Sequence, residues 1–221
     1  MNRPYTANSK LEDCRSHGPD SGAELFIVEG DSAANSVIAA RDKLFQAVLP
    51  MQGKPLNVDK ASRKRLAENI WLQTLFKTLG CGVNHKFNIK ALRYERVMLL
   101  FDPDADGIHC GALMMICFER LMPELLDTGR VHMVRAPLLR VTSPSLSAPI
   151  YVHAPTHHHE IVRELKERDI DDYQLMRYRG LGSLERDLLV DQCLLPETRR
   201  AKAVTRDDAQ MAMKMFGGGF R

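Results

Sequence analysis

The chain has 221 residues, 44% of them hydrophobic and 27% charged, with a formal net charge of +3. This composition is ordinary for a soluble globular protein, and the length allows one substantial domain with an appendage or two small domains. The small positive charge permits contact with nucleic acid but does not by itself indicate it. The five cysteines are scattered and include no C-x-x-C pair, which argues against a disulfide framework or a zinc site.

Hydropathy excludes two further classes of protein, those with a signal peptide and those that span a membrane. The first 19 residues are polar throughout, so no signal peptide is predicted. No apolar run approaches the roughly 18 residues that a membrane-spanning helix needs. We therefore expect a cytoplasmic protein with no membrane contact.

The part of the chain before residue 80 predicts a polar arm and two strand–helix pairs. Residues 1–22 are polar and rich in turn formers, and we expect a flexible N-terminal arm there. Gly30-Asp31-Ser32 is typical of a turn followed by a helix cap, and Gly80 is a helix stop signal. Around these signals the patterns predict strands over residues 23–29 and 45–50 and helices over residues 33–40 and 62–79.

The most informative stretch is an apolar run closed by the acidic turn Asp102-Pro103-Asp104-Ala105-Asp106-Gly107. The run over residues 97–101 predicts a strand that is buried on both faces. Alternate side chains of an extended segment point the same way, so we expect the three carboxylates to converge and to raise one another's pKa. A hard divalent cation such as Mg2+ or Mn2+ would relieve this repulsion.

The acidic turn has two other interpretations. Asp, Pro and Gly are ordinary turn residues, so a solvated acidic turn stays open beside the metal site. An EF-hand loop would place Asp102, Asp104 and Asp106 at its first, third and fifth positions. It fails at the twelfth position, where Leu113 stands in place of the required Glu.

The elements after the turn indicate the fold class. A long apolar helix is predicted from Ile108 to Leu121 or Leu126, followed by a strand over residues 131–134. Alternation of strands and helices predicts an α/β fold, with a parallel sheet and helices on both faces. Ligands of such sheets bind beyond the carboxyl ends of the strands, where Glu29 and the acidic turn both fall.

The pattern changes after residue 137. We expect residues 23–140 to form the α/β domain and residues 141–221 to form a linker and a small α-rich C-terminal tail. Within this tail we expect a linker or hairpin over residues 142–155, a helix over 160–168, a basic glycine-containing loop over 177–183, a basic run over 196–206 and a helix over 207–216.

Two motifs at strand ends carry a family resemblance. With Glu29-Gly30-Asp31-Ser32-Ala33 and the acidic turn, the chain resembles the Toprim domain, a Rossmann-like fold. It resembles more closely the Toprim-containing C-terminal part of the DNA gyrase B subunit and its type IIA relatives. The resemblance extends from about Leu11 to about Met215 and includes, in the order of the family, Leu11-Glu12-Asp13-Cys14, Gln52-Gly53-Lys54-Pro55-Leu56-Asn57-Val58, Met122-Pro123-Glu124-Leu125, Ala136-Pro137-Leu138, Arg177-Tyr178-Arg179-Gly180-Leu181-Gly182 and Pro196-Glu197-Thr198-Arg199-Arg200.

The chain departs from the family pattern at a few positions. Ala34 and Asn35 replace a glycine pair, Pro103 replaces an alanine, and Ser183-Leu184 replaces a Glu-Met pair. These departures leave the carboxylates of both motifs intact.

The resemblance implies a Mg2+-dependent DNA cleavage and religation centre, with Mn2+ able to substitute. Two ions roughly 4 Å apart can bracket a phosphodiester displacement. Glu29 and Asp102 would hold one ion, Asp102 and Asp104 would hold or share the second, and Asp106 would support the metal cluster. Glu29, Asp102 and Asp104 are the expected catalytic residues, and Glu29 has a second possible role as general acid toward the 3'-oxygen.

The basic residues divide into two groups. Lys54, Arg177 and Arg179 are expected to contact DNA phosphates, with the loop over residues 177–182 packed beside the acidic site. The basic run from Arg199 to Arg206 is expected to be a solvated surface.

The expected partners follow from the same resemblance. They are double-stranded DNA and a gyrase A-like subunit that carries the catalytic tyrosine. The ATPase region of the family lies upstream of the matching segment, so we expect no ATP site here and an ATPase domain that is separate or missing. The expected location is the bacterial nucleoid.

Two other functions remain open at this stage. One is a stand-alone Toprim nuclease that uses a water molecule in place of tyrosine. The other is a truncated relative that binds DNA or the partner subunit without catalysis. Metal-dependent cleavage by the chain alone would distinguish the nuclease, and inactivity with and without a tyrosine subunit would distinguish the binding protein.

Overall fold

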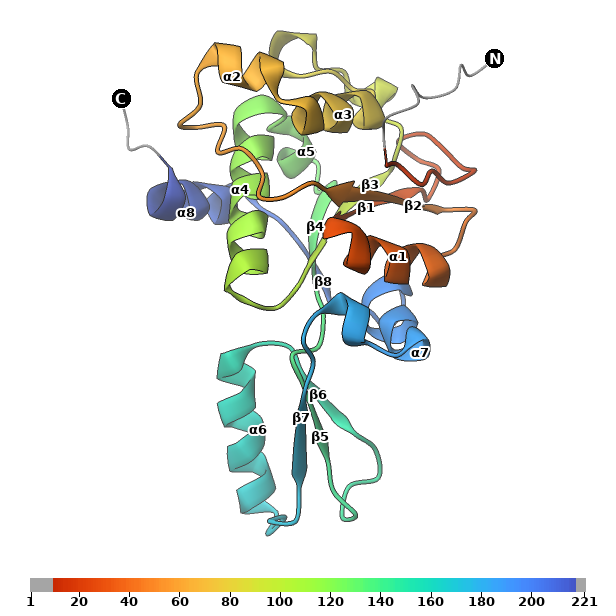
Figure 1. Cartoon of the computed structure of the whole chain (residues 1–221), viewed down its shortest axis with the longest axis vertical. Helices are drawn as coiled ribbons and strands as arrows, with labels where there is room; N and C mark the ends of the chain where they lie inside the picture. Colours follow the sequence, from red (N-terminus) through yellow and green to blue (C-terminus); the bar gives the residue numbers. More distant parts are fainter. Residues whose placement is uncertain (1–9, 218–221) are drawn as a thin grey trace.

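A five-stranded sheet and a smaller three-stranded sheet organise the molecule (Figure 1). The computed structural model describes residues 10–217. Its strands are β1 (Glu24–Glu29), β2 (Gln46–Met51), β3 (Arg96–Phe101), β4 (Val131–Arg135), β5 (Leu139–Thr142), β6 (Ile150–Val152), β7 (Gln174–Arg177) and β8 (Ala201–Ala203). Its helices are α1 (Gly30–Ala40), α2 (Arg63–Glu68), α3 (Ile70–Leu79), α4 (Ala105–Leu121), α5 (Glu124–Asp127), α6 (Pro155–Glu167), α7 (Arg186–Leu189) and α8 (Arg206–Phe216), with the short turns η1 (Asn84–Lys86), η2 (Ile89–Ala91), η3 (Leu181–Ser183) and η4 (Val190–Leu194).

The larger sheet has the strand order β2-β1-β3-β4-β8. Its first four strands are parallel, and β8 is antiparallel to β4 at the edge. Parallel neighbours need crossover connections, which α1, α3 and α4 provide. The predicted α/β class, a mostly parallel sheet with helices on both faces, is confirmed.

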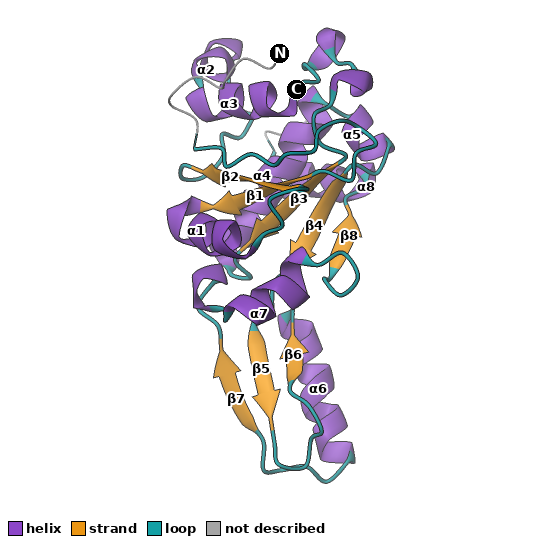
Figure 2. Ribbon diagram, turned by 90° about the vertical axis from the view of Figure 1, so that its right-hand side faces the viewer, coloured by secondary structure: helices purple, strands orange, loops and turns teal. Residues whose placement is uncertain are grey.

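The sheet is buried because its central strands are apolar on both faces. In β1, Leu25 and Ile27 join a core cluster with α3 and α4, whereas Phe26 and Val28 join a second cluster with α1 and α7. This two-residue alternation is the period of a strand, and it assigns each helix layer to one face (Figure 2). Helix α8 packs outside α4 through Ala212.

The smaller sheet has the order β6-β5-β7 and is antiparallel. Helix α6 covers one of its faces through Ile161 and Leu165, and the whole unit extends away from the larger sheet (Figure 1). The stretch that the sequence left open as a linker or hairpin is the β5–β6 hairpin. The expected domain boundary after residue 140 falls inside β5, and the division into domains stays a prediction.

The chain returns from the smaller sheet to the larger one. Residues after β7 form α7 and η4 beneath α1, and β8 then joins the edge of the main sheet. Arg199 donates to both carboxylate oxygens of Glu24, at 2.6 and 2.5 Å, and both side chains are 5% exposed or less. The expectation of a solvated basic run is therefore wrong at Arg199.

The N-terminal segment is packed from residue 10 onward. Glu12 forms an antiparallel bridge with Val48, with both hydrogen bonds at 2.9 Å. Asp13 accepts hydrogen bonds from Arg93 at 2.5 Å and from Tyr94 at 2.7 Å. The flexible arm expected over residues 1–22 is not found over residues 10–22, and residues 1–9 lie outside the described part of the chain.

The helix expected over residues 62–79 is divided at Asn69. This residue is extended, with φ −75° and ψ 107°, and its side chain accepts a hydrogen bond from the Leu72 N–H at 2.9 Å. Asn competes well as an N-cap, so it begins α3 and ends α2. Within residues 10–217, no helix is long and apolar enough to cross a membrane.

Candidate functional site

The main sheet brings the two acidic motifs to one edge. β1 and β3 are parallel neighbours with Val28 beside Leu100, so both strands end at the same side of the sheet. Glu29 is the last residue of β1, and Asp102 directly follows β3. The two carboxylates therefore lie where parallel sheets bind their ligands.

The acidic turn is not extended beyond Asp104. Asp104 is the N-cap of α4, and its side chain accepts a hydrogen bond from the Gly107 N–H at 2.8 Å. Asp106 consequently lies in the first helical turn, so the expected two-residue alternation of all three carboxylates is wrong. Gly107 is required here, because a Cβ atom would lie 2.0 Å from the Asp102 carbonyl oxygen.

Burial and mutual repulsion raise the pKa of Glu29. Burial has the largest effect, followed by the negative charges of Asp102, Asp104 and Asp106. Among the described residues, buried Glu29 Oε2 has no hydrogen-bond partner. A buried carboxylate oxygen in this state needs a proton or a cation.

Asp102 and Asp106 have opposite environments. Burial raises the pKa of Asp102, although a hydrogen bond from the Leu181 N–H acts in the lowering direction. The ammonium of Lys54 lies 2.7 Å from Asp106 Oδ1 and lowers the pKa of that carboxyl. Mutual repulsion therefore raises the pKa of Glu29 and Asp102, as expected, but the expected increase does not occur at Asp106.

The basic loop over residues 177–182, called the arginine loop from here on, packs against the acidic turn, as predicted. The Leu181 N–H donates to Asp102 Oδ1 at 2.7 Å. A hollow of about 350 Å³ lies between the two segments, and its lining residues are Asp102, Pro103, Asp104, Leu138, Arg177, Tyr178, Arg179 and Gly180.

The two arginines of this hollow are available to a ligand. Arg177 and Arg179 are both exposed. Neither guanidinium has an ion pair or hydrogen bond with any residue in the described range 10–217. Two unpaired cations beside a cluster of carboxylates suit a ligand that carries phosphates and binds together with metal ions.

The sequence missed the role of Gly180. Gly180 closely approaches the Asp102 carboxylate, and the Leu181 N–H holds that carboxylate. The only available signal was the glycine itself, which does not identify the group that approaches it.

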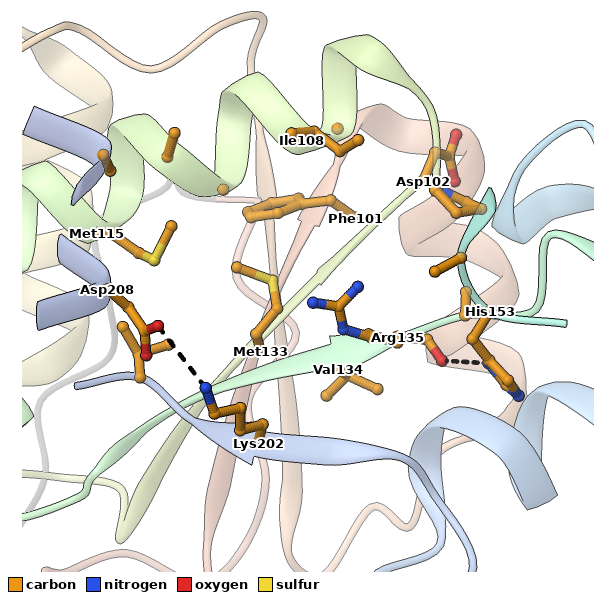
Figure 3. A pocket seen from close by; sticks show the side chains of 18 of the residues that line it. Phe101, Asp102, Ile108, Met115, Met133, Val134, Arg135, His153, Lys202 and Asp208 are labelled. Carbon is orange, nitrogen blue, oxygen red and sulfur yellow. Dashed lines mark hydrogen bonds and ion pairs between the residues drawn. The ribbon is translucent and has the colours of Figure 1, made fainter. Parts of the chain in front are cut away.

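A larger pocket of about 380 Å³ lies between α4, α8 and the β4–β8 edge (Figure 3). Its lining is mainly apolar and includes Phe101, Met115 and Met133, with Asp102 at one end. The Lys202 ammonium, at its rim, lies 3.7 Å from Asp208. An apolar lining suits neither phosphates nor hydrated cations, so we assign the functional site to the smaller, charged hollow.

The carboxylate set fits a divalent cation. Glu29, Asp102 and Asp104 offer hard oxygen ligands, and the unpartnered Glu29 oxygen lacks the partner that a cation would supply. Asp106 already has Lys54 as its partner. By their chemistry these three carboxylates are the residues of this site that could hold Mg2+, although their oxygens do not all lie within 4.8 Å of one another in this structure.

A second cluster of possible ligands does not fit a metal ion. Over residues 10–217, three candidate ligand atoms lie within 4.8 Å of one another only at Asp13, Cys14 and His17. Arg93 and Tyr94 already bind Asp13. Burial raises the pKa of Cys14 to about 11, which keeps the thiol protonated and unsuited to metal binding.

Comparison with known protein families matches residues 24–136 to the Toprim domain. The chain belongs to the Toprim domain family. The matched segment extends from β1 to the residue after β4, so it contains both acidic motifs and the sheet edge that joins them. This Toprim segment does not include the arginine loop, which the structure brings to the same site.

The Toprim chain is also similar to the DNA gyrase B subunit of several organisms. It is 38% identical over 211 residues to that of Thermotoga maritima, covering 96% of this chain and 32% of that protein. For Haloferax volcanii the identity is 39% over 207 residues, covering 94% and 32%. For Mycolicibacterium smegmatis it is 35% over 211 residues, covering 94% and 31%. The predicted resemblance is confirmed, and the chain spans about a third of the length of these relatives.

Proposed function

We propose that this chain is the Mg2+-dependent DNA cleavage and religation module of a gyrase B-like type IIA topoisomerase. One observation carries the proposal. Within the part of the chain that the structure describes, Glu29 has an unpartnered buried oxygen at the same sheet edge as Asp102 and Asp104, and unpaired arginines share a hollow with these aspartates. Such a site offers oxygen ligands to metal ions and guanidinium groups to phosphates. Similarity to the gyrase B subunit supports DNA as the source of those phosphates.

We assign the metal ligands to Glu29, Asp102 and Asp104. Mg2+ bound there would neutralise charge on the scissile phosphate and on the departing 3'-oxygen. The alternative role of Glu29 is that of a general acid toward the 3'-oxygen, in which it would not ligate the metal; its raised pKa suits this role, because the carboxyl keeps a proton closer to neutral pH than an ordinary glutamate. Asp106 supports the cluster by holding Lys54 beside it.

We assign DNA positioning to Lys54, Arg177 and Arg179. Their charges would contact phosphates without reading the base sequence. Lys54 is half-exposed while paired with Asp106, so it can reach a backbone phosphate from its present place.

The nucleophile is proposed to come from a gyrase A-like tyrosine subunit. Tyr178 is the tyrosine of the arginine loop, but it is only 4% exposed. Burial raises its pKa, which disfavours the phenolate that would attack a phosphate. The proposed setting is the bacterial nucleoid, with ATP hydrolysed by a different domain and no ATP site in this chain.

Reconstitution tests the proposed function. The chain is mixed with supercoiled DNA and Mg2+, with and without the gyrase A subunit of Thermotoga maritima. We expect protein-linked double-strand breaks only in the complete mixture, and none when Asp102→Asn replaces the native chain. Cleavage by the chain alone would identify a stand-alone nuclease, and duplex binding without cleavage in either mixture would identify a non-catalytic binding protein.

A further inference from the structure

We propose that the turn at Gly180 and Leu181 positions the Asp102 carboxylate for metal binding and couples it to the arginines that bind phosphate. The part of this proposal that concerns metal binding rests on the proposed function. The positioning itself rests on contacts between two segments that are 79 residues apart in the sequence.

The first contact fixes one oxygen of Asp102. The Leu181 N–H donates to Oδ1 at 2.7 Å, which leaves Oδ2 free for another partner. A carboxylate that ligates a metal depends on such a second hydrogen bond for its orientation. A backbone donor is well suited to this role, because it cannot change rotamer.

The second contact makes glycine necessary at position 180. Gly180 has φ 143°, and a Cβ atom there would lie 2.5 Å from Asp102 Oδ2 and 2.9 Å from Cγ. The carboxylate could not keep its place against a side chain at this distance. Gly180 therefore allows the close approach that lets the next N–H reach Asp102.

The turn is held rigidly on both sides. Ser183 Oγ accepts from the Arg179 N–H at 3.0 Å and donates to the Gly180 carbonyl at 2.7 Å. Gly182 packs so closely against α1 that a Cβ atom would lie 2.8 Å from Ser32 Oγ. A shift of the Arg179 backbone would therefore disturb the hydrogen bonds that hold the peptide beside Asp102.

This connection predicts energetic coupling. A phosphate held by Arg177 and Arg179 stabilises the turn, and the turn in its present place orients Asp102 for the metal. Binding free energies are reciprocal, so duplex DNA and the metal should raise each other's affinity by the same factor. We expect this factor to be about fivefold or more.

The first test compares two alanine substitutions at glycines with positive φ. Gly180→Ala should weaken Mn2+ binding, measured by paramagnetic resonance titration, by about tenfold or more. It should also remove the coupling to a short DNA duplex. Gly129→Ala is the matched control, because Gly129 has φ 64° and no atom lies within 4 Å of the position that a Cβ atom would take there. The control should leave both quantities unchanged.

A metal-free measurement tests the positioning separately. Gly180→Ala is made in the native chain and in Asp102→Ala, and urea midpoints are compared by circular dichroism. Removing the carboxylate removes the obstructing atoms, so Gly180→Ala should lower the midpoint less in the Asp102→Ala background. An equal decrease in both backgrounds would overturn the proposal.

The outcomes separate this proposal from the proposed function. If the native chain binds no Mn2+, the proposed function fails, while the urea comparison still decides whether Gly180 positions Asp102. If Gly180→Ala does not fold, Ser183→Ala replaces it, because it releases the turn without adding an atom. Ser183→Ala should then weaken Mn2+ binding several-fold, and native-like affinity in a folded variant would refute the proposal.

Discussion

Two half-buried side chains show how single residues set the behaviour of this protein. Glu29 and Asp102 are ionisable groups with pKa values raised by burial, and both lie at the end of a buried strand. Ionising both without a counter-ion costs free energy of folding, because like charges then share a poorly solvated place. A bound divalent cation would convert this repulsion into attraction.

Metal binding should therefore be visible as stabilisation. Added Mg2+ should raise the melting temperature, because ligand binding adds about 2.7 kcal/mol to the free energy of unfolding at a Mg2+ concentration of 100 times Kd. Asp102→Asn should remove most of this shift and should slightly stabilise the metal-free protein. Asp171→Asn, at an exposed position between α6 and β7, is the control and should leave the shift intact. An unchanged melting temperature of the native chain in saturating Mg2+ would contradict the metal assignment.

His132 should make stability depend on pH. Burial lowers its pKa, and the nearby charges of Arg96 and Arg199 act in the same direction. The unfolded chain then binds this proton at higher pH than the folded chain. Stability is therefore fully present above the ordinary histidine pKa of about 6.5 and is lost as pH falls toward the lowered folded value.

Replacing this histidine should remove its part of the pH dependence. In urea unfolding from pH 7.5 to pH 5, His132→Gln should lose less stability than the native chain. The exposed His159→Gln on α6 serves as the control and should follow the native profile. Identical profiles for His132→Gln and the native chain would show that the His132 proton does not contribute.

At the scale of elements, the most consequential contact joins the β7–η3 loop to the β3–α4 turn. The loop leaves the smaller sheet through β7 and reaches the carboxyl edge of the larger sheet at Asp102. The proposed metal ligands and the two arginines are therefore supplied by different sheets. Orientation of the smaller sheet determines where the two arginines lie relative to the carboxylates.

Removing the two arginines should weaken DNA binding in a salt-dependent way. In fluorescence anisotropy with duplex DNA, Arg177→Ala combined with Arg179→Ala should reduce the slope of log K against log salt by about 2. Arg63→Ala with Arg65→Ala is the matched control on α2, which lies at the end of the molecule opposite the smaller sheet (Figure 1). If the loop variant keeps the native slope and affinity, the loop does not contact phosphate.

At the scale of the whole molecule, the C-terminal segment connects the smaller sheet back to the larger one. Residues after the smaller sheet return to the larger sheet, where β8 pairs with β4 and α8 packs on α4. The Arg199–Glu24 pair joins this segment to the first residue of β1, across 175 residues of sequence. The segment therefore packs into the same core as the sheet that carries the two acidic motifs.

Breaking that ion pair should destabilise the entire fold. Arg199→Met leaves the buried Glu24 carboxylate with a 3.5 Å contact to Arg96 and a 3.3 Å hydrogen bond from the Gln46 amide, neither of which replaces the close arginine pair. The loss should be about 3 kcal/mol in urea unfolding monitored by circular dichroism. Glu24→Gln combined with Arg199→Met should recover much of it, because no uncompensated charge remains. The exposed Arg200→Ala is the control, and a comparable loss there would remove the special role of Arg199.

The sequence alone determined the α/β class and the positions of Glu29 and Asp102 at strand ends. Both depend on local patterns, namely continuous apolar runs followed by turn residues, which specify buried strands and their ends. It also located the arginine loop correctly, through its resemblance to the family. It did not reveal the cap at Asp104, because a turn of Asp, Pro and Gly permits extended and helix-starting backbone alike.

Only the tertiary structure decided which distant groups meet. Asp102 is held by Leu181, Asp106 is paired with Lys54, and Glu24 is paired with Arg199. Such contacts leave no periodic signal in the chain, because each depends on how the sheets and loops pack rather than on neighbours in sequence. The amino-acid sequence alone does not distinguish an arginine that will be exposed from one that will be buried. Tertiary packing places the Arg199 side chain in the interior, where its ion pair stabilises the fold, and leaves Arg177 and Arg179 exposed and available to a ligand.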